Sequence, residues 1–348
     1  MPYPEQYGII ANFDILSEDY IPENIPGRES QIKELKFCLD PISRRKTPMN
    51  AWLYGPPGSG KTATSRLVMK QTCQAYNVHG VYVNCWERNS LYSILDKVIA
   101  ELRILGAEKP DTSFKMERLQ RCLKGDPLIL VLDEIDQPPP KERNSMLYNL
   151  CEIENVGMIC ICNSRSFLHD LDERIKSRLN VVQIEFKPYS ATDLRYILSL
   201  RAETALVPRT WGRDILERIS EIADGDARVA IQTLKNAAYY AEKSSSPRIL
   251  PEHIEKGWKD ARVIKKTYLL NKLTADHRIL YEIIKARKEI LSNQLWEAYL
   301  SEAQTRGIKS IALRTYSEYV NKLRDLGLIQ AERAKVRGKV RVFRVVNE

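Results

Sequence analysis

A glycine-rich octapeptide in the first quarter of the chain has the spacing of a phosphate-binding loop. Residues 55–62 read Gly-Pro-Pro-Gly-Ser-Gly-Lys-Thr, which fits the pattern G-x-x-x-x-G-K-[ST]. Such a loop turns backbone N–H groups inward toward an anion, and the start of a helix adds further donors. Lys61 is expected to reach the β- and γ-phosphates, and the Thr62 hydroxyl to hold Mg²⁺. The loop therefore predicts that ATP or ADP binds with Mg²⁺ through Pro57, Gly58, Ser59, Gly60, Lys61, Thr62, Ala63 and Thr64.

A second motif supplies the carboxylates that metal-assisted hydrolysis needs. Residues 128–134 read Leu-Ile-Leu-Val-Leu-Asp-Glu, an apolar run that ends in two acidic residues and is typical of a buried strand. Asp133 is expected to bind the metal, directly or through water. Glu134 is expected to polarise the attacking water as a general base. A glycine-rich turn can arise by chance, but such a turn would not be accompanied by an apolar strand that ends in two carboxylates. The two motifs together therefore indicate an ATP-binding protein.

The segments around the two motifs have the patterns of an α/β nucleotide-binding domain. Apolar runs at 49–54 and 81–85 predict strands, and the patterns at 63–75 and 90–102 predict helices. A further helix is expected at about 114–123. It carries Lys115, Arg118 and Arg121 at three-residue steps, so their side chains are expected on one face. This basic face is either a solvated surface or a DNA contact.

Other polar positions are expected to complete the nucleotide site. Asn163 follows a predicted strand beside the two carboxylates, where an amide could orient the hydrolytic water. Residues 225–228, Gly-Asp-Ala-Arg, open a helix, so Arg228 is expected to close onto the γ-phosphate. Arg174 and Arg178 lie one helical turn apart, and either one could stabilise the transferring phosphate in a neighbouring subunit. An ordinary charged surface helix is the alternative for this pair.

Length and composition exclude several classes of protein. The chain has 348 residues, which is too long for one ordinary core, so two or three domains are expected. Hydrophobic residues make up 43% and charged residues 28%, as in globular proteins. No apolar run approaches the ~18 residues of a membrane span, and the first residues do not resemble a signal peptide. We therefore expect a cytoplasmic, nucleoid-associated protein with no membrane partner. The seven scattered cysteines predict reduced core thiols rather than a metal site.

The net charge of +9 is concentrated near the C-terminus. Residues 261–348 hold 19 of the 54 Lys and Arg residues but only 9 of the 45 Asp and Glu residues. This segment therefore has a net charge of +10, and the rest of the chain one of −1. A basic segment joined to a nearly neutral body is typical of nucleic-acid binding. A solvated basic surface is the plainer alternative.

The order of elements in the basic segment favours DNA. Helical patterns at 275–286, 292–305 and 311–326 precede residues 332–344, where basic residues alternate with small or apolar ones and predict a β-hairpin with a cationic face. Three helices followed by a hairpin form a winged helix, whose third helix would bury Leu313, Val320 and Leu323. Protein contact is the other use of such a domain. The expected DNA-binding residues are Arg314, Thr315 and Ser317 on the helix and Arg333, Lys335, Arg337, Lys339 and Arg341 on the hairpin.

The order of these motifs resembles the archaeal origin-recognition proteins, a replication-initiator family of AAA+ ATPases related to eukaryotic origin recognition complex subunits. The resemblance spans nearly the whole chain. It implies an AAA+ P-loop parallel-sheet domain of the α/β class at 1–188, a helical lid at 189–260 and a winged-helix DNA-binding domain at 261–348, with a linker at 260–266. The helix at 114–123 lies where the family carries a DNA-contacting insertion.

The resemblance also implies roles for individual residues. Residues 20–28, with Ile21 and Arg28, resemble the adenine-binding segment of the family, and Tyr189 and Arg201 would line the nucleotide pocket. Further matches are Asn163 to the first sensor, Arg228 to the second sensor, and residues 177–179, with Arg178, to an arginine-finger box. Thr315 stands where a second arginine is expected in the recognition helix, so the DNA sequence that the family recognises is not carried over.

The function that the resemblance implies is a slow ATPase that is switched by ATP and marks double-stranded DNA at a replication origin. Its expected partners are the replicative helicase and other initiator subunits. A nucleotide-controlled winged-helix transcription regulator is one alternative, although it would not need the basic helix at 114–123. A clamp-loader-like AAA+ ATPase is the other, although it would carry an oligomerisation collar in place of the basic segment.

Overall fold

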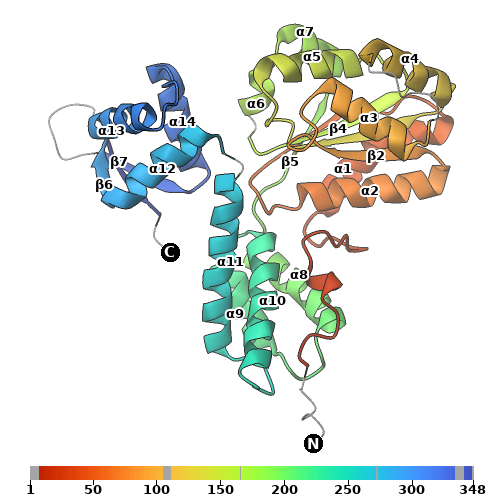
Figure 1. The fold of residues 1–348 in the computed structure, drawn as a ribbon. Coiled ribbons are helices and arrows are strands. Elements are labelled where there is room, and N and C mark those ends of the chain that lie inside the picture. The colour runs from red at the N-terminus through yellow and green to blue at the C-terminus, as the bar shows by residue number, and fades with distance from the viewer. Residues whose placement is uncertain (1–7, 105–110, 165, 272, 334–340, 347–348) are drawn as a thin grey trace, which may run out of the picture. The chain divides into compact units, whose positions relative to one another are not determined.

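The computed structural model describes residues 8–104, 111–164, 166–271, 273–333 and 341–346 (Figure 1). The chain folds into two compact units that divide between Pro251 and Glu252. The seven cysteines are free; four of them are buried as core thiols, whereas Cys122 is exposed. In the described ranges, no helix is long and apolar enough to cross a membrane.

A five-stranded parallel sheet forms the centre of the first unit. The strands are β1 (Ala51–Tyr54), β2 (His79–Asn84), β3 (Leu128–Asp133), β4 (Val156–Cys162) and β5 (Val182–Glu185). They lie in the order β2-β3-β4-β1-β5. Strands β1, β3 and β4 are buried along their whole length, which explains their continuous apolar sequences. Strand β4 lies between β1 and β3, so the chain after β4 emerges between the two predicted motifs.

Helices cover both faces of this sheet (Figure 1). Successive residues of β3 point to opposite faces, so Ile129 and Val131 pack with α1 and α2, whereas Leu130 and Leu132 pack with α3, α4, α5 and α7. The helical segments are the 3₁₀ turns η1 (Asp14–Leu16) and η2 (Asp40–Arg44), and the α-helices α1 (Glu29–Leu39), α2 (Lys61–Tyr76), α3 (Leu91–Glu101), α4 (Thr112–Leu123), α5 (Pro140–Leu150), α6 (Ser166–His169) and α7 (Glu173–Leu179).

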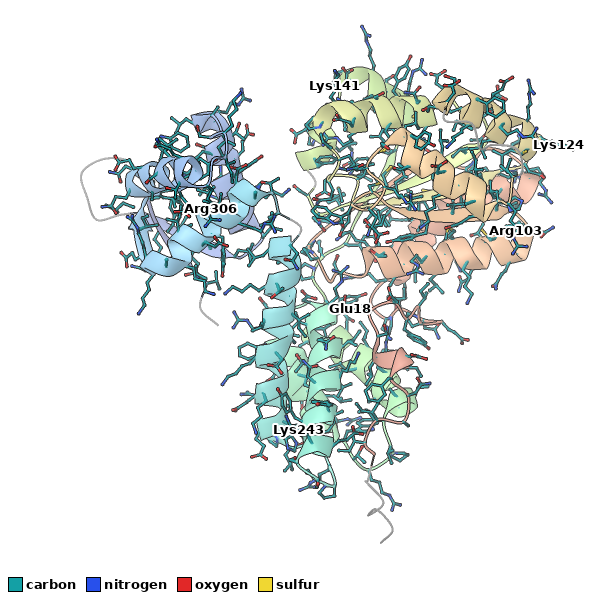
Figure 2. The ribbon with its side chains drawn as sticks, in the orientation of Figure 1. Glu18, Arg103, Lys124, Lys141, Lys243 and Arg306 are labelled. Carbon is teal, nitrogen blue, oxygen red and sulfur yellow. The ribbon has the colours of Figure 1, made fainter. Side chains whose placement is uncertain are left out.

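A helical lid completes the first unit with α8 (Ala191–Ala205), α9 (Arg213–Ile222) and α10 (Ala227–Lys243). A capping box between Ser190 and Asp193 begins α8. Gly225 precedes α10 with a φ of +78°, and a Cβ there would lie only 2.7 Å from the Pro188 Cβ, so this turn requires glycine. Figure 2 shows Lys243 where α10 ends.

The second unit has the helix and strand order of a winged helix. Its elements are α12 (Ala275–Arg287), β6 (Glu289–Leu291), α13 (Ser292–Thr305), α14 (Leu313–Asp325), β7 (Ile329–Arg333) and β8 (Arg341–Val345), and its antiparallel sheet has the order β6-β8-β7. Residues 260–266, the predicted linker, are helical and continue α11 (Pro251–Asn271).

The packed face of α14 differs from the prediction at one position. Tyr316, Val320 and Leu323 are buried at the spacing i, i+4, i+7, and the Tyr316 hydroxyl donates a 3.2 Å hydrogen bond to the Ser292 carbonyl. Leu313 was expected in this core but is 59% exposed. It is the first residue of the helix and lies before the turn that reaches the core.

Candidate nucleotide site and nucleic-acid interface

The glycine-rich loop at 55–62, called the P-loop below, joins β1 to α2 as predicted. Gly58 and Gly60 have φ values of +76° and +87°, in the left-handed region that favours glycine. A Cβ on Gly58 would lie 1.9 Å from Asp226 Oδ1, and one on Gly60 would lie 2.3 Å from the Tyr189 hydroxyl. The lid therefore approaches the P-loop so closely that both positions also need glycine for space.

The P-loop holds donors that a phosphate group would satisfy. Lys61 is only 6% exposed, and its ammonium donates to the carbonyls of Gly55 at 2.7 Å and Pro56 at 2.9 Å. The hydroxyls of Ser59 and Thr64 are buried without a hydrogen-bond partner among the described residues. Within the same ranges, no side chain caps the N-terminus of α2. A buried cation, uncapped N–H groups and unsatisfied hydroxyls in the P-loop and the first turn of α2 fit the phosphates of ATP or ADP.

A hydroxyl and a carboxylate meet beside this loop. Thr62 Oγ1 donates to Asp133 Oδ2 at 2.7 Å, and the Tyr82 hydroxyl donates to the same oxygen at 2.8 Å. Mg²⁺ prefers oxygen ligands and usually keeps substrate phosphates in its shell. The described residues contain no group of three or more His, Cys, Asp or Glu side chains that could hold a metal alone. Thr62 and Asp133 therefore fit Mg²⁺ only together with a nucleotide. Sequence analysis missed Tyr82, because no motif marks its position on β2.

The proposed base and first sensor follow neighbouring strands. Glu134 follows β3, and its backbone N–H donates to Asp133 Oδ1 at 2.9 Å. Its φ of +56° is uncommon for a residue other than glycine, and such strain is concentrated at functional sites. Asn163 follows β4, which is paired with β3. Both side chains are half-buried at the edge of the sheet that the P-loop also leaves.

The start of α10 contacts the P-loop. The Ala227 N–H donates to the Gly58 carbonyl at 3.1 Å, and Asp226 caps the helix by accepting from the Arg228 N–H at 2.9 Å. The pKa of Lys61 is lowered to about 8, chiefly by burial; the charge of Asp133 opposes this shift and that of Arg228 contributes to it. The predicted second sensor therefore lies within electrostatic range of the phosphate-binding lysine.

Arg28 and Tyr189 lie together beside the P-loop. The Arg28 guanidinium is 4% exposed and lies 3.8 Å from the centroid of the Tyr189 ring. Its Nε donates to the Ser59 carbonyl at 2.8 Å, and its Nη2 donates to the Lys187 carbonyl at 2.6 Å. Arg28 therefore fixes the P-loop to the segment that enters the lid. These two hydrogen bonds are made to backbone carbonyls, so Arg28 positions the loop.

Arg201 contacts the N-terminal segment of the chain. Its guanidinium donates to the carbonyl of Ile15 and, at 3.3 Å, to that of Tyr20, and it lies 4.5 Å from the centroid of the Tyr20 ring. Burial lowers its pKa to about 10. Arg201 therefore holds the N-terminal segment at the point where the expected adenine-binding residues 20–28 begin. That Arg201 also lines the nucleotide pocket stays a prediction. Ile21, the next residue of that segment, is half-buried.

The two candidate trans-acting arginines differ in their surroundings. Arg178 forms an ion pair with Glu152, and its guanidinium lies 4.4 Å from the centroid of the Tyr148 ring. Arg174 is exposed and makes no side-chain hydrogen bond or ion pair with the residues that the structure describes. A role in a neighbouring subunit's site stays a prediction for both.

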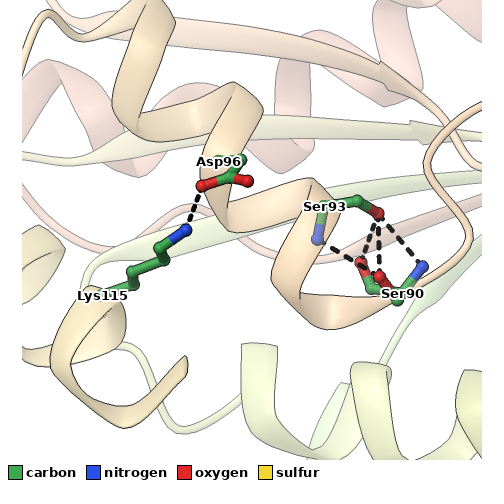
Figure 3. Close-up of polar contacts among 4 residues, drawn as sticks. All are labelled: Ser90, Ser93, Asp96 and Lys115. Carbon is green, nitrogen blue, oxygen red and sulfur yellow. Dashed lines mark hydrogen bonds and ion pairs between the residues drawn. The ribbon is translucent and has the colours of Figure 1, made fainter. Parts of the chain in front are cut away.

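Lys115 does not belong to the predicted basic face of α4. Its side chain is 2% exposed and pairs with Asp96 of α3 (Figure 3). Its ammonium also lies 3.6 Å from the centroid of the Tyr92 ring. The same view shows the capping box of Ser90 and Ser93 that begins α3. Lys115 faces the contact between α3 and α4, where its charge is neutralised. The expectation that it contacts DNA is therefore wrong for this structure.

The outer end of α4 remains basic without Lys115. Arg121 is exposed and forms an ion pair with Glu117 one turn earlier, whereas Arg118 is half-buried. Lys124 directly follows α4 and Arg103 lies just beyond the end of α3, and both are exposed at the edge of the unit (Figure 2). DNA contact at this edge stays a prediction, carried by Arg121 rather than by Lys115.

The start of α14 presents the expected polar residues. Arg314 is 93% exposed and pairs with Glu318 of the next turn at 3.3 Å. Ser317 is exposed, and its hydroxyl donates to the Leu313 carbonyl at 3.1 Å. Thr315 is half-buried. An exposed, polar first turn is the part of a recognition helix that enters a major groove.

Two arms of the predicted hairpin are described. In the antiparallel pair β7 and β8, Arg333 lies opposite Arg341. Two basic residues of the alternating pattern therefore occupy paired positions on the two strands. Arg341 is exposed. The hairpin predictions for Lys335, Arg337 and Lys339 lie outside the described residues.

Comparison with known proteins covers both the sheet and the lid. Residues 24–161 match the AAA ATPase domain family, and residues 195–259 match the Cdc6 AAA+ ATPase-type lid domain. The ORC1-type DNA replication protein 1 of Sulfurisphaera tokodaii is 30% identical over 361 residues, which cover 97% of this chain and 90% of that protein. The ORC1-type DNA replication protein of Thermoplasma volcanium is 31% identical over 364 residues, with coverages of 98% and 89%.

Solved structures have the same fold as this chain. The Aeropyrum pernix ORC1 protein, solved in complex with DNA, superposes with a TM-score of 0.76 at 28% identity and covers 97% of this chain and 94% of that one. The Cdc6p protein from Pyrobaculum aerophilum has the same fold, with a TM-score of 0.67 at 22% identity and coverages of 97% and 94%.

Proposed function

Since the chain belongs to the ORC1-type family of archaeal replication proteins, which are AAA+ ATPases, we propose that it binds duplex DNA at a replication origin under the control of ATP. One observation carries the nucleotide part of this proposal: the start of α10, which bears Arg228, is hydrogen-bonded to the P-loop through Ala227 and Gly58. A change at the γ-phosphate would therefore act on the lid.

In the proposed reaction, water would attack the γ-phosphorus of ATP, the bond to the bridging oxygen would break, and ADP and inorganic phosphate would be released. Lys61 and the N–H groups of the P-loop hold the phosphates, and Thr62 and Asp133 hold the metal. Glu134 accepts the proton of the attacking water, and Asn163 orients that water. Arg228 within the chain, together with Arg178 or Arg174 of a neighbouring subunit, stabilises the charge on the transferring group.

DNA binding is proposed for the second unit. The exposed first turn of α14 is suited to read base edges, and the basic hairpin is suited to bind phosphates. The net charge of +10 in residues 261–348 supports this, and so does the Aeropyrum pernix ORC1 structure, which was solved with DNA. Arg121 at the end of α4 is proposed as a second contact.

Origin marking also implies partners. We propose that other initiator subunits supply the trans-acting arginine and that the replicative helicase is recruited to the marked DNA. The relatives from Sulfurisphaera tokodaii and Thermoplasma volcanium are both named ORC1-type DNA replication proteins, which favours replication over transcription as the process.

Nuclease footprinting tests the proposal. The full-length protein is incubated with ATP on chromosomal origin DNA and, in parallel, on promoter DNA of equal length and base composition. Protection of discrete sites in the origin at concentrations that leave the promoter unprotected is the expected result. Protection of promoters alone would replace the proposal with a nucleotide-controlled transcription regulator.

A further inference from the structure

The N-terminal segment at residues 8–20, called the strap below, lies against the lid (Figure 1). Its first anchor is Glu242 in the last turn of α10. One carboxylate oxygen of Glu242 accepts two backbone hydrogen bonds, from the Ile9 N–H at 2.7 Å and from the Ile10 N–H at 2.9 Å. Hydrogen bonds to a charged acceptor are stronger than neutral ones. A single side chain of the lid therefore fixes the start of the strap.

The end of α8 provides a second anchor. Ile10 forms an antiparallel bridge with Leu206, and the Val207 N–H donates to the Ile9 carbonyl at 2.9 Å. The Ala205 carbonyl accepts from the strap at 2.8 Å and 3.0 Å. The Ile9 side chain is fully buried, so apolar packing accompanies these hydrogen bonds.

Arg201 is the third anchor. Its buried guanidinium donates to the carbonyls of Ile15 and Tyr20, near the middle and at the end of the strap. If the strap left the lid, this guanidinium would lose both acceptors, and a buried donor without a partner is costly. The strap is thus held to the lid along its whole length.

The chain beyond the strap is fixed to the P-loop. Arg28 follows the strap by eight residues, and its guanidinium donates to the Ser59 carbonyl of the P-loop. The lid also contacts the P-loop directly, through Ala227 and Gly58. Strap, lid and P-loop therefore form a closed ring of contacts. The start of α10 cannot move away from the P-loop unless the strap leaves the lid or the segment at 21–28 rearranges.

We propose that the strap is a latch on the nucleotide site and that Glu242 and Arg201 set the rate at which nucleotide leaves. Glu242 is a positioning residue, because its contacts are with the strap and not with the P-loop. Arg201 acts through the same strap, whose last residue it holds. The latch rests on the proposed nucleotide binding at Lys61. According to this proposal, ADP leaves the site when the strap detaches from the lid.

Release of the fluorescent nucleotide MANT-ADP tests the latch. The full-length protein is loaded with MANT-ADP and chased with excess ADP in a stopped-flow instrument. Glu242→Ala removes both charged hydrogen bonds and is expected to release the nucleotide about tenfold faster. Glu242→Gln keeps an acceptor oxygen, so its release rate is expected to lie between those of the wild type and Glu242→Ala. Glu221→Ala is the matched control, because Glu221 is an exposed lid residue whose side chain makes no hydrogen bond or ion pair with the described residues. Its release rate should equal that of the wild type.

A cross-link provides a test that does not depend on a destabilised variant. The bridge partners Ile10 and Leu206 are at a spacing that a disulfide can span. Ile10→Cys with Leu206→Cys, in a Cys122→Ser background because Cys122 is exposed, is compared in its oxidised and reduced forms. The oxidised form is expected to release MANT-ADP several-fold more slowly than the reduced form.

Two outcomes would count against the inference in different ways. Equal release rates for oxidised and reduced protein, together with a wild-type rate for Glu242→Ala, would overturn the latch while leaving nucleotide binding intact. Binding of MANT-ADP by Lys61→Ala at wild-type affinity would overturn the proposed nucleotide site, and the latch with it.

Discussion

The Thr62 hydroxyl donates a 2.7 Å hydrogen bond to Asp133, although the two residues are 71 positions apart in the sequence. The contact joins the start of α2 to the end of β3. The Thr62 hydroxyl and the Asp133 carboxylate, which are both expected to hold Mg²⁺, therefore lie next to each other. Nucleotide binding and hydrolysis are therefore predicted to share one site.

Nucleotide affinity should fall above about pH 8. Burial lowers the pKa of Lys61 from 10.5 to about 8, and a phosphate beside the ammonium would raise it again. Below pH 8 the ammonium is charged before and after binding. Above pH 8 the free side chain has lost its proton, so binding must take one up, and affinity should fall by up to ~tenfold per pH unit. Titration with MANT-ADP from pH 7 to pH 10 measures this. A flat profile would contradict it, and Lys61→Ala should not bind at any pH.

Glu134→Gln should separate binding from hydrolysis. The variant keeps Lys61, Thr62 and Asp133, so ATP affinity is expected to stay near that of the wild type. Loss of a general base typically lowers the rate by ~10²-fold or more. Equilibrium ATP binding and steady-state phosphate release measure the two quantities. Hydrolysis at the wild-type rate would reject Glu134 as the base.

The parts of this site that could be predicted from sequence are local. The P-loop glycines and Lys61 are coded by one short motif, and the apolar run of β3 ends in Asp133. Asn163 was predictable because β4 is apolar and buried, and strand pairing then places its end beside β3. Each of these features depends on neighbours in sequence or on the common edge of a parallel sheet.

The contacts that could not be predicted from sequence are made with distant partners. Arg201 is part of a helix that resembles a nucleotide-pocket segment, but its acceptors are carbonyls of the strap, 186 and 181 residues away. Lys115 fits a basic stripe at helical spacing, but its partner Asp96 belongs to another helix. Tyr82 was missed because a period-2 pattern predicts its strand without predicting that its hydroxyl reaches Asp133. Charge patterning alone does not distinguish a solvent-facing cation from one buried in a helix contact.

Arg178 should act in a neighbouring subunit. An arginine supplied in trans raises hydrolysis by ~10³-fold or more when fully engaged. Arg178→Ala and Lys61→Ala should each be inactive alone, whereas a mixture should regain activity, because the intact site of the first receives the arginine of the second. Steady-state phosphate release measures this. A mixture with no more activity than its separate components would contradict the trans role, and recovery with Arg174→Ala in place of Arg178→Ala would identify Arg174 as the trans-acting residue.

DNA affinity and DNA specificity should respond to different residues. Neutralising Arg337 and Lys339 is expected to weaken binding to every duplex and to reduce the slope of log affinity against log salt by about one unit per lost contact. Arg314→Ala is expected instead to reduce the preference for origin DNA over shuffled DNA, because it removes a side chain suited to read bases. Fluorescence anisotropy titrations at several salt concentrations measure both effects. Loss of specificity in the hairpin variant with no change in salt slope would contradict this division.

The central claim is that nucleotide state controls binding to origin DNA through the lid. Its most direct test is the affinity of the full-length protein for an origin duplex at fixed salt, measured with a non-hydrolysable ATP analogue and with ADP, for the wild type and for Arg228→Ala. Coupling between two sites typically changes affinity by about 5- to 150-fold. We predict a difference in this range for the wild type and a much smaller one for Arg228→Ala. Equal wild-type affinities in the two nucleotide states, or equal affinities for origin and shuffled duplexes, would contradict the account.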